Sequence, residues 1–336
     1  MIIEYKKSLR SLNTFGVNCI AENFINIKKD EDIKESIQYL KNTKKNHFIL
    51  GGGSNILLTK NITGVVLYNQ INGIKIIDEN STSATIKVGS GVIWNDFVNW
   101  SIKNQLWGIE NLILIPGTTG AAPIQNIGAY GAEIKDVLIN VTGFNMLTGE
   151  KKTFNNEECE FEYRSSIFKR KLKNTFFITE LLIKLKKNGK PNIKYEALKV
   201  EAEKEKEELL LKKIAILVSK IRNSKLPNPL EIGNAGSFFK NPIISIEELQ
   251  RIKRSYPDVK YFPLKKEAKL SAGWLIEKCG WKEKKQKNCG VYEKQALVLI
   301  NFGKASGLEI KELSNKIISD INAKFGITLE NEVQIF

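Results

Sequence analysis

The chain has 336 residues, of which 42% are apolar and 9% aromatic, so it can bury a large core in two or three domains. This composition excludes a largely disordered protein. No apolar run approaches the roughly 18 residues needed to cross a bilayer, and residues 1–10 mix charges with a short apolar start. We therefore expect a soluble, cytoplasmic protein.

The chain is basic, with 52 Lys and Arg against 37 Asp and Glu, a net charge of +15. This charge would suit an anionic partner. The lysines are spread along the chain, however, and no stretch interleaves basic and aromatic residues as a nucleic-acid surface would. We expect small-molecule ligands and no nucleic acid or membrane partner. A non-catalytic, basic nucleotide- or RNA-binding protein is kept as an alternative.

The cysteines give no sign of a metal site. Cys19, Cys159, Cys279 and Cys289 are scattered without a C-x-x-C motif, and His47 is the only histidine. Zinc and iron–sulfur sites require clusters of such ligands. We therefore predict no metal ion and four free, buried thiols.

The first elements suggest a small α/β unit. The apolar pattern predicts a short helix over 31–40, a strand over 47–50 and another strand over 64–68. The glycine-rich segment 51–55 comes directly after the first of these strands. Its loop should therefore lie at the carboxyl end of a strand.

The remaining chain suggests two further α+β domains. Between 71 and 185 the pattern predicts short strands, such as 74–77 and 84–88, with one helix over 92–103. Apolar residues at helical spacing predict a helix over 206–222, which Pro227 and Pro229 discourage from continuing. The last part is expected to form helices over 245–256, 271–279 and 309–325 and a strand over 296–301.

Two segments could hold a dinucleotide. Glycines in 51–55 let backbone N–H groups approach an anion such as pyrophosphate, although the spacing is neither a Rossmann nor a Walker fingerprint. Alone, this segment is equally consistent with a tight turn. The segment 115–131 mixes glycine, proline, small and amide residues with apolar anchors, which a flexible linker would lack. Its backbone and side-chain amides and hydroxyls could bind phosphate oxygens and the edge of a planar ring, although a packed irregular turn remains an alternative.

Several motifs occur in the order found in the UDP-N-acetylenolpyruvoylglucosamine reductase (MurB) family, which the chain resembles over essentially its whole length. The matching segments are 13–17, 51–55, 115–131, 161–168, 225–227, 233–242 and 329–333. The region around Tyr195 resembles the longer, type I form of the family.

This resemblance implies an α+β fold of three domains, in which two form a PCMH/VAO-type FAD-binding module and the third binds substrate. The expected boundaries are 1–70 and 71–225 for the two FAD-binding subdomains, 226–328 for the substrate-binding domain and 329–336 for a C-terminal strand that returns to the first subdomain.

The resemblance also implies a reaction and its cofactors. Members of the family reduce the enolpyruvyl group of UDP-N-acetylglucosamine enolpyruvate to a lactyl ether, giving UDP-N-acetylmuramate for peptidoglycan, with FAD and NADPH as cofactors. They are typically monomers. The residues expected to bind FAD are Gly51, Gly52, Gly53, Ser54, Asn55, Pro116, Gly117, Thr118, Thr119, Gly120, Ala121, Gln125, Asn126, Gly128, Ala129, Tyr130 and Gly131.

Three residues match the catalytic positions of the family. Arg164 is expected to bind the substrate carboxylate and the developing enolate. Ser237, on a glycine-rich turn, is expected to donate a proton. Glu332 matches the glutamate that assists at the enolate. Glu330 would share its face of a strand, and we choose Glu332 because the family's glutamate directly precedes a valine, as here.

Tyr195, Lys225 and Asn241 match positions associated with the UDP diphosphate. A lysine is a suitable point charge for this group, whereas Tyr195 is equally well explained as a packed tyrosine. The main rival function is a flavin-dependent oxidase of alcohols or hydroxy acids. Such enzymes often link the flavin through His or Cys, and here His47 lies before the first glycine loop, which disfavours this rival.

Overall fold

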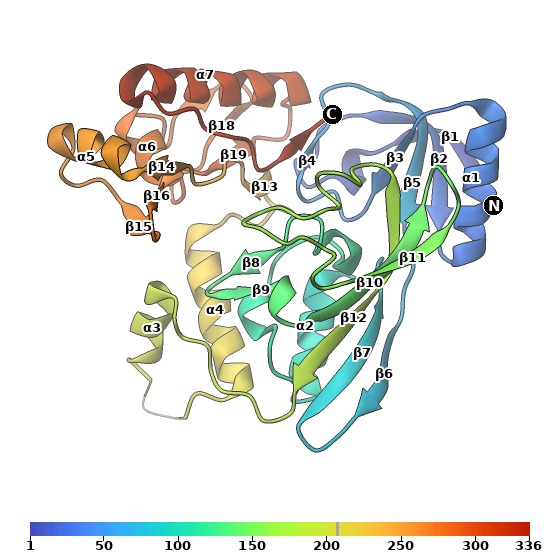
Figure 1. The fold of residues 1–336 in the computed structure, drawn as a ribbon. Coiled ribbons are helices and arrows are strands. Elements are labelled where there is room, and N and C mark those ends of the chain that lie inside the picture. Colours follow the sequence, from blue (N-terminus) through green and yellow to red (C-terminus); the bar gives the residue numbers. More distant parts are fainter. Residues whose placement is uncertain (206–207) are drawn as a thin grey trace. The chain divides into compact units, whose positions relative to one another are not determined.

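The computed structural model describes residues 1–205 and 208–336. It divides into two units, the first formed by 1–7, 20–53 and 62–223 and the second by 8–19, 54–61 and 224–336. Helices and mainly antiparallel sheets occur in both units, which confirms the predicted α+β class (Figure 1). Two segments before residue 224, 8–19 and 54–61, belong to the second unit. The division into three domains stays a prediction.

The N-terminal part of the first unit is a four-stranded sheet covered by one helix. Its strands lie in the order β1 (Ile3–Ser8), β2 (Ile20–Ile27), β5 (Ile62–Asn69), β3 (His47–Leu50). Both β2 and β3 run parallel to β5, and α1 (Asp30–Thr43) connects them. Ile33, Ile37 and Leu40 of α1 recur at helical spacing and pack on the apolar sheet residues. The predicted helix and both strands are confirmed.

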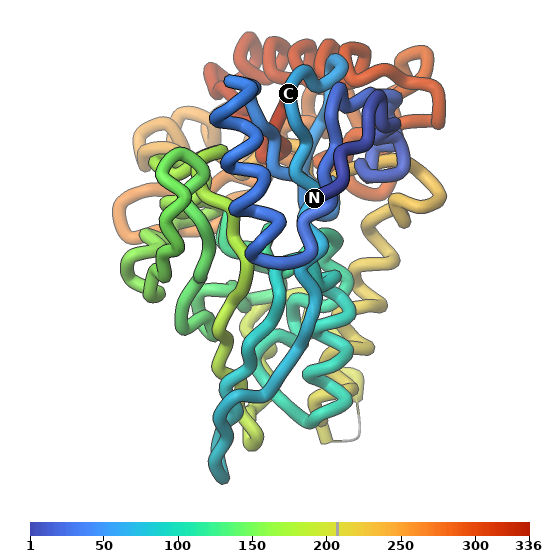
Figure 2. Tube along the Cα trace, turned by 90° about the vertical axis from the view of Figure 1, so that its right-hand side faces the viewer, coloured from blue at the N-terminus to red at the C-terminus, as the bar shows by residue number. Residues whose placement is uncertain are grey.

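The second sheet of this unit is antiparallel. Its order is β11 (Lys151–Asn155), β10 (Leu138–Asn145), β12 (Phe176–Lys186), β7 (Ser83–Gly89), β6 (Ile74–Glu79). Helices α2 (Trp94–Lys103) and α4 (Leu211–Lys225) share one hydrophobic core with its strands. In Figures 1 and 2 the β6–β7 hairpin projects beyond the other strands of this sheet.

Helix α4 begins at Leu211, whereas the sequence predicted a start at 206. Residues 206–207 lie outside the described residues, and Leu210, included in the predicted helix, is 58% exposed. The shorter helix α3 (Glu196–Ala202) precedes this segment.

Residues 224–336 of the second unit form two small antiparallel sheets and three α-helices. One sheet has the order β13 (Gly233–Ser237), β19 (Val298–Asn301), β18 (Cys289–Val291), β17 (Lys285–Gln286), and the other β14 (Ile243–Ser245), β16 (Glu267–Leu270), β15 (Tyr261–Pro263). The helices are α5 (Ile246–Ser255), α6 (Ala272–Lys278) and α7 (Gly307–Phe325), each close to its predicted range. A short parallel pair joins β4 (Ile56–Leu57) to β20 (Gln334–Ile335).

Local chemistry explains where the longest helix begins and ends. Ser306 and Glu309 form a reciprocal capping box at the start of α7, and Gly326 ends it in the left-handed conformation, with φ of 70°. A Cβ atom on Gly307 would collide with the carbonyl oxygen of Leu58. The start of α7 therefore lies directly on the 54–61 segment, which is why this segment belongs to the second unit.

Among the described residues, no helix is long and apolar enough to cross a membrane, and no group of three His, Cys, Asp or Glu residues could hold a metal ion. The four cysteines are free; Cys19, Cys159 and Cys289 are buried, and Cys279 is half-buried.

These environments predict the thiol reactivity of the native protein. Burial raises the pKa of Cys159 to about 12 and that of Cys289 to about 11, so their reactive thiolate forms are scarce near neutral pH. We expect a disulfide reagent to modify Cys279 first in native protein and all four thiols after unfolding. Rapid modification of Cys159 in the native state, located by mass spectrometry, would contradict this burial.

Candidate active site

The two predicted ligand loops lie against each other in the first unit. A Cβ atom on Gly52 would lie 2.7 Å from the Cα of Gly117, and one on Gly51 would lie 2.9 Å from the Thr118 hydroxyl oxygen. Cβ atoms do not tolerate such distances, so this approach requires glycine. Residues more than 60 positions apart in the printed sequence thus form one glycine-lined surface whose backbone is open to a ligand.

Two side chains of the second loop are engaged by the protein itself. The Thr119 hydroxyl donates to the Gly89 carbonyl at 2.6 Å. The buried Asn126 amide donates to Glu133 at 3.0 Å and to the Glu162 carbonyl at 3.3 Å. Both side chains therefore brace the loop, and any contact they make with a cofactor would come from their backbone.

The other half of the first loop, Ser54 and Asn55, belongs to the second unit. The Asn55 carbonyl accepts from the Gln334 amide at 3.0 Å, and its side chain donates to the Glu332 carbonyl at 3.4 Å. The C-terminal segment thus returns to the first glycine loop. Its strand is limited to Gln334–Ile335, and Glu332 precedes it.

Tyr130 and Gly131 form the two-residue turn of a small hairpin between β8 (Gly128–Ala129) and β9 (Ala132–Glu133). Their φ angles are 49° and 83°. Positive φ at both central positions is typical of a type I′ turn, where a bulky tyrosine is strained. The Tyr130 ring packs edge-on against that of Tyr195, with centroids 5.2 Å apart. A predicted cofactor residue and a predicted substrate residue are therefore neighbours.

Arg164 also lies in a strained turn. The Glu162 amide donates to the Ser165 carbonyl at 3.0 Å, and the Ser165 amide donates to the Glu162 carbonyl at 3.2 Å. Tyr163 and Arg164 form the turn between them. The φ of Arg164 is 53°, a conformation for which glycine is favoured at this position. Its guanidinium donates to the Gly128 carbonyl at 2.8 Å. The turn therefore directs a cation to the edge of the second glycine loop.

Ser237 lies on a strand, whereas the sequence predicted a turn. It is the last residue of β13, opposite Val298, and a register shift separates it from Asn234. Gly236 has a φ of 67° within this shift, and its amide donates to the buried Asn234 side chain at 2.9 Å. Glycines that suggested a turn instead form a bulge, which can redirect the next side chain.

Glu332 is held beside this strand end. Its amide donates to the Phe238 carbonyl at 2.8 Å, one residue after Ser237, and Phe239 and Asn331 form an antiparallel bridge. Glu332 is half-buried. The Glu330 side chain is 73% exposed and forms an ion pair with Lys240 at 2.8 Å. The two glutamates therefore differ in environment. The backbone of Glu332 bonds to Phe238, the residue directly after Ser237, whereas the backbone of Glu330 bonds to Lys240.

The expected diphosphate residues have different surroundings. Asn241 accepts from the Ala272 amide at 2.9 Å through its side-chain oxygen, which fixes its amide at the start of α6. Tyr195 is 40% exposed despite its ring contact. Lys225 is exposed at the end of α4.

Sequence reasoning did not single out Arg222, the basic residue one helical turn before Lys225. Its guanidinium donates to the Leu114 carbonyl at 3.1 Å. Burial lowers the pKa of Arg222, and the nearby Tyr130 phenol partly offsets this shift. On sequence alone it resembled one more basic residue of a polar helix face. Asn111 was also missed; it donates to the carbonyls of Tyr130 and Asn192 at 2.7 and 2.8 Å and so ties the hairpin to the segment before Tyr195.

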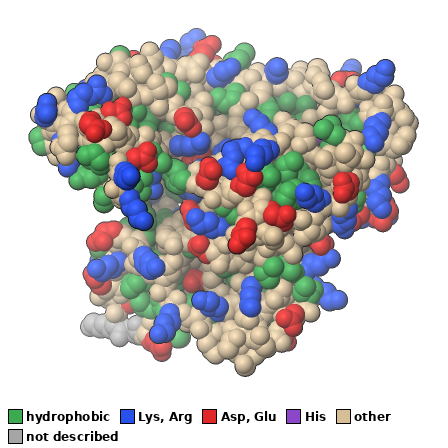
Figure 3. All heavy atoms as spheres, viewed as in Figure 1, with side chains coloured by type: hydrophobic (Ala, Val, Ile, Leu, Met, Phe, Trp, Pro, Cys, Tyr) green, Lys and Arg blue, Asp and Glu red, His purple; other side chains and the backbone are tan. Residues whose placement is uncertain are grey.

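The charged side chains do not form one uniform basic surface on the visible face. Figure 3 shows Lys and Arg side chains (blue) with Asp and Glu side chains (red) interspersed among them. On this face, basic side chains are therefore accompanied by acidic ones.

Comparisons with known proteins agree with these loops and motifs. Residues 21–154 match a family model described as an FAD binding domain, and residues 228–336 match the C-terminal domain of UDP-N-acetylenolpyruvoylglucosamine reductase. The chain is 44% identical to the UDP-N-acetylenolpyruvoylglucosamine reductase of Flavobacterium johnsoniae, covering 100% of both chains, and 41% identical to that of Bdellovibrio bacteriovorus, covering 99% of both. The crystal structure of the Thermus caldophilus enzyme (MurB) matches with a TM-score of 0.68 at 21% identity, over 100% of this chain and 98% of that one.

The glycine-lined surface and the FAD-binding match define a flavoprotein oxidoreductase. FAD is its cofactor, and the close approach of Gly52 to Gly117 fits the backbone access that a pyrophosphate requires. The chain belongs to the UDP-N-acetylenolpyruvoylglucosamine reductase family.

The close approach of Gly52 to Gly117 predicts that a larger residue at position 52 reduces flavin binding. Gly52→Ala would force the two loops apart, because its Cβ would meet the Gly117 backbone. We expect the purified variant to carry less than about one tenth of the wild-type flavin, since a shift of about 1.4 kcal/mol in binding is tenfold. Absorbance near the flavin band relative to protein measures this content.

Gly149→Ala is the matched control. Gly149 has a φ of 84° and only an Ile37 methyl group near its absent Cβ, so alanine strains the β10–β11 turn without touching the loops. It should lose stability but retain flavin. Equal flavin loss in both variants would show that general destabilisation, rather than the loop contact, is responsible.

Proposed function

We propose that this protein reduces the enolpyruvyl double bond of UDP-N-acetylglucosamine enolpyruvate, giving UDP-N-acetylmuramate, with NADPH as the reductant. The observation that carries this proposal is the hydrogen bond of the Glu332 amide to the carbonyl of Phe238, the residue directly after Ser237, which brings the backbone of the proposed proton donor and that of the proposed glutamate together at a strand bulge. Membership of the family supports the choice of substrate. The protein would act as a monomer in the cytoplasm.

FAD would be held by the backbone of the two glycine loops, Gly51–Gly53 and Pro116–Gly120, whose N–H groups suit a diphosphate. When bound, it supplies hydride chemistry at the substrate double bond. Thr119 and Asn126 hold the second loop in shape through their bonds to Gly89, Glu133 and Glu162.

Arg164 would bind the substrate carboxylate. Once hydride has added to the terminal carbon of the double bond, negative charge develops toward this carboxylate as an enolate. A guanidinium can meet it with two parallel N–H groups. Because the Gly128 carbonyl and the turn fix Arg164 in advance, little reorganisation is needed as the charge grows.

Ser237 would donate the proton that completes the lactyl group. Among the described residues no hydrogen bond holds its side-chain hydroxyl, so the hydroxyl can turn toward a substrate carbon. Serine is a weak acid, and only a strongly basic carbanion can take its proton. Glu332 would assist at the enolate. Lys225, Tyr195 and Asn241 would bind the UDP diphosphate, with Asn241 presenting its amide because its oxygen is already engaged.

Product analysis tests the proposed reaction directly. The protein is incubated with FAD, NADPH and UDP-N-acetylglucosamine enolpyruvate, and the nucleotide product is identified by mass spectrometry. We expect a product heavier than the substrate by two hydrogens, with one NADPH consumed for each. NADPH oxidation that consumes oxygen and leaves the substrate unchanged would instead support a flavin oxidase and refute the proposal.

Replacing the proposed proton donor should separate the two halves of the reaction. In Ser237→Ala we expect NADPH to bleach the flavin at the wild-type rate, while the return of colour on adding substrate slows by about 10²–10⁴-fold, the usual contribution of a positioned acid. Anaerobic stopped-flow absorbance measures both steps. Ser255→Ala, an exposed serine in the same unit, is the control. If both steps slowed equally, Ser237 would have no specific part in proton donation.

The two neighbouring glutamates provide a second matched pair. Glu332→Gln should slow the return of flavin colour by about 10²-fold, because an amide is a much weaker proton donor to the developing enolate than a carboxylic acid. Glu330→Gln breaks only an exposed ion pair with Lys240, which is worth at most about 1 kcal/mol, so its rate should stay within about twofold of wild type. The reverse ranking of the two variants would transfer the catalytic role to Glu330.

A further inference from the structure

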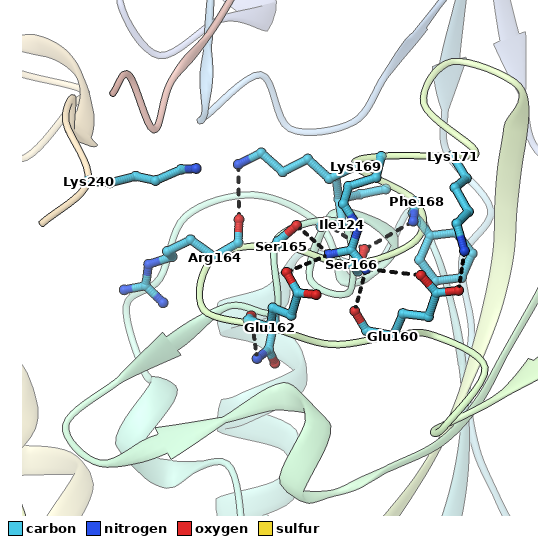
Figure 4. A network of polar contacts seen from close by, with 12 residues as sticks. Ile124, Glu160, Glu162, Arg164, Ser165, Ser166, Phe168, Lys169, Lys171 and Lys240 are labelled. Atoms are coloured by element: carbon cyan, nitrogen blue, oxygen red, sulfur yellow. Dashed lines mark hydrogen bonds and ion pairs between the residues drawn. The ribbon is translucent and has the colours of Figure 1, made fainter. Parts of the chain in front are cut away.

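The turn that carries Arg164 is held in an unfavourable backbone conformation. Both Glu160 and Arg164 have positive φ angles, of 46° and 53°. Such residues persist only where their surroundings determine them strongly. In Figure 4 the Arg164 guanidinium points away from the carboxylates of Glu160 and Glu162.

Arg170 contacts both arms of this turn. One terminal nitrogen donates to the Ser165 hydroxyl at 2.8 Å and lies 3.0 Å from the Glu162 carboxylate. The other donates to the Glu160 carbonyl at 3.0 Å and to its carboxylate at 3.1 Å. Glu160 and Glu162 precede Arg164, and Ser165 follows it. One planar side chain, only 32% exposed, therefore links the residues on either side of Arg164.

The opposite side of the turn is tied to the second glycine loop. Asn126 donates to the Glu162 carbonyl at 3.3 Å, and the Ser166 hydroxyl donates to the Ile124 carbonyl at 2.7 Å. Lys169 bridges the Arg164 carbonyl and the Gln125 side chain, each at 3.3 Å. The loop thus fixes one side of the turn, while Arg170 closes the other.

We propose that Arg170 is a positioning residue for Arg164. It acts through the backbone of the turn, holding the positive φ that directs the Arg164 guanidinium to the Gly128 carbonyl. This inference rests on the proposed function, because it concerns the step in which Arg164 meets the substrate carboxylate. A lysine at this position could pair with one glutamate but could not span both arms.

The test compares Arg170→Ala and Arg170→Lys with wild type in anaerobic stopped-flow experiments. Lys171→Ala is the matched control, because Lys171 also pairs with Glu160, at 2.7 Å, but is 68% exposed. We expect Arg170→Ala to slow the return of flavin colour by substrate about tenfold, since small misplacements of a catalytic group cost up to about 10²-fold. Flavin bleaching by NADPH should stay within about twofold, Arg170→Lys should recover part of the loss, and Lys171→Ala should match wild type.

A double variant adds a readout that a merely structural role would not give. If Arg170 acts through Arg164, then Arg170→Ala should slow an Arg164→Lys protein by less than about twofold, because the group it positions is already replaced. Equal slowing of both half-reactions by Arg170→Ala, or the full tenfold loss in the Arg164→Lys background, would overturn the positioning role.

The proposed function and this inference fail in different ways. If wild-type protein is bleached by NADPH but not recoloured by substrate, the proposed function fails and the positioning role falls with it. If wild type turns over and Arg170→Ala equals it, only the positioning role is overturned.

Discussion

The close approach of Gly52 to Gly117 is the constraint on which the cofactor surface depends. No side chain larger than hydrogen fits between these backbones. The second loop can be this close because its own side chains, including Thr119 and Asn126, are turned to protein partners. A surface made mostly of backbone can present several N–H groups to a diphosphate at once, which a surface of long side chains could do only with a loss of their conformational entropy.

Two strained turns lie beside this surface. Tyr130 and Arg164 both adopt positive φ angles in two-residue turns, where glycine or asparagine would fit more easily. Each turn is held by specific bonds: Asn111 to the Tyr130 carbonyl, and Arg170 around the Arg164 turn. Unfavourable backbone conformations that specific hydrogen bonds hold in place are typical of functional sites, where the position of a side chain matters more than local stability.

Much of this arrangement could be predicted from the sequence. Helical spacing of Ile33, Ile37 and Leu40 identifies α1, and an apolar run ending in glycines locates β3 and the loop after it. The ordered motifs indicate the family and its cofactor. These signals are local in sequence. They depend on the spacing of apolar residues or on residue types, such as glycine, that few other structures require.

Other features were not predictable, because they depend on how the folded backbone brings segments together. The glycines before Ser237 indicated a turn, but pairing with β19 draws them into a bulged strand. Segments 8–19 and 54–61 join the second unit through backbone contacts such as that of Gly307 with Leu58. Arg170 stands in a run of basic residues, 169–171, that reads as surface charge, and only the folded turn reveals its acceptors.

In the proposed reaction, electrons pass from NADPH through this flavoprotein to an enolpyruvyl sugar nucleotide. The most direct test is anaerobic: the purified protein with FAD is bleached by one equivalent of NADPH, and UDP-N-acetylglucosamine enolpyruvate is then added. We expect prompt return of the oxidised flavin absorbance. A spectrum that stays bleached until air is admitted would contradict the proposed substrate while leaving the flavin fold intact.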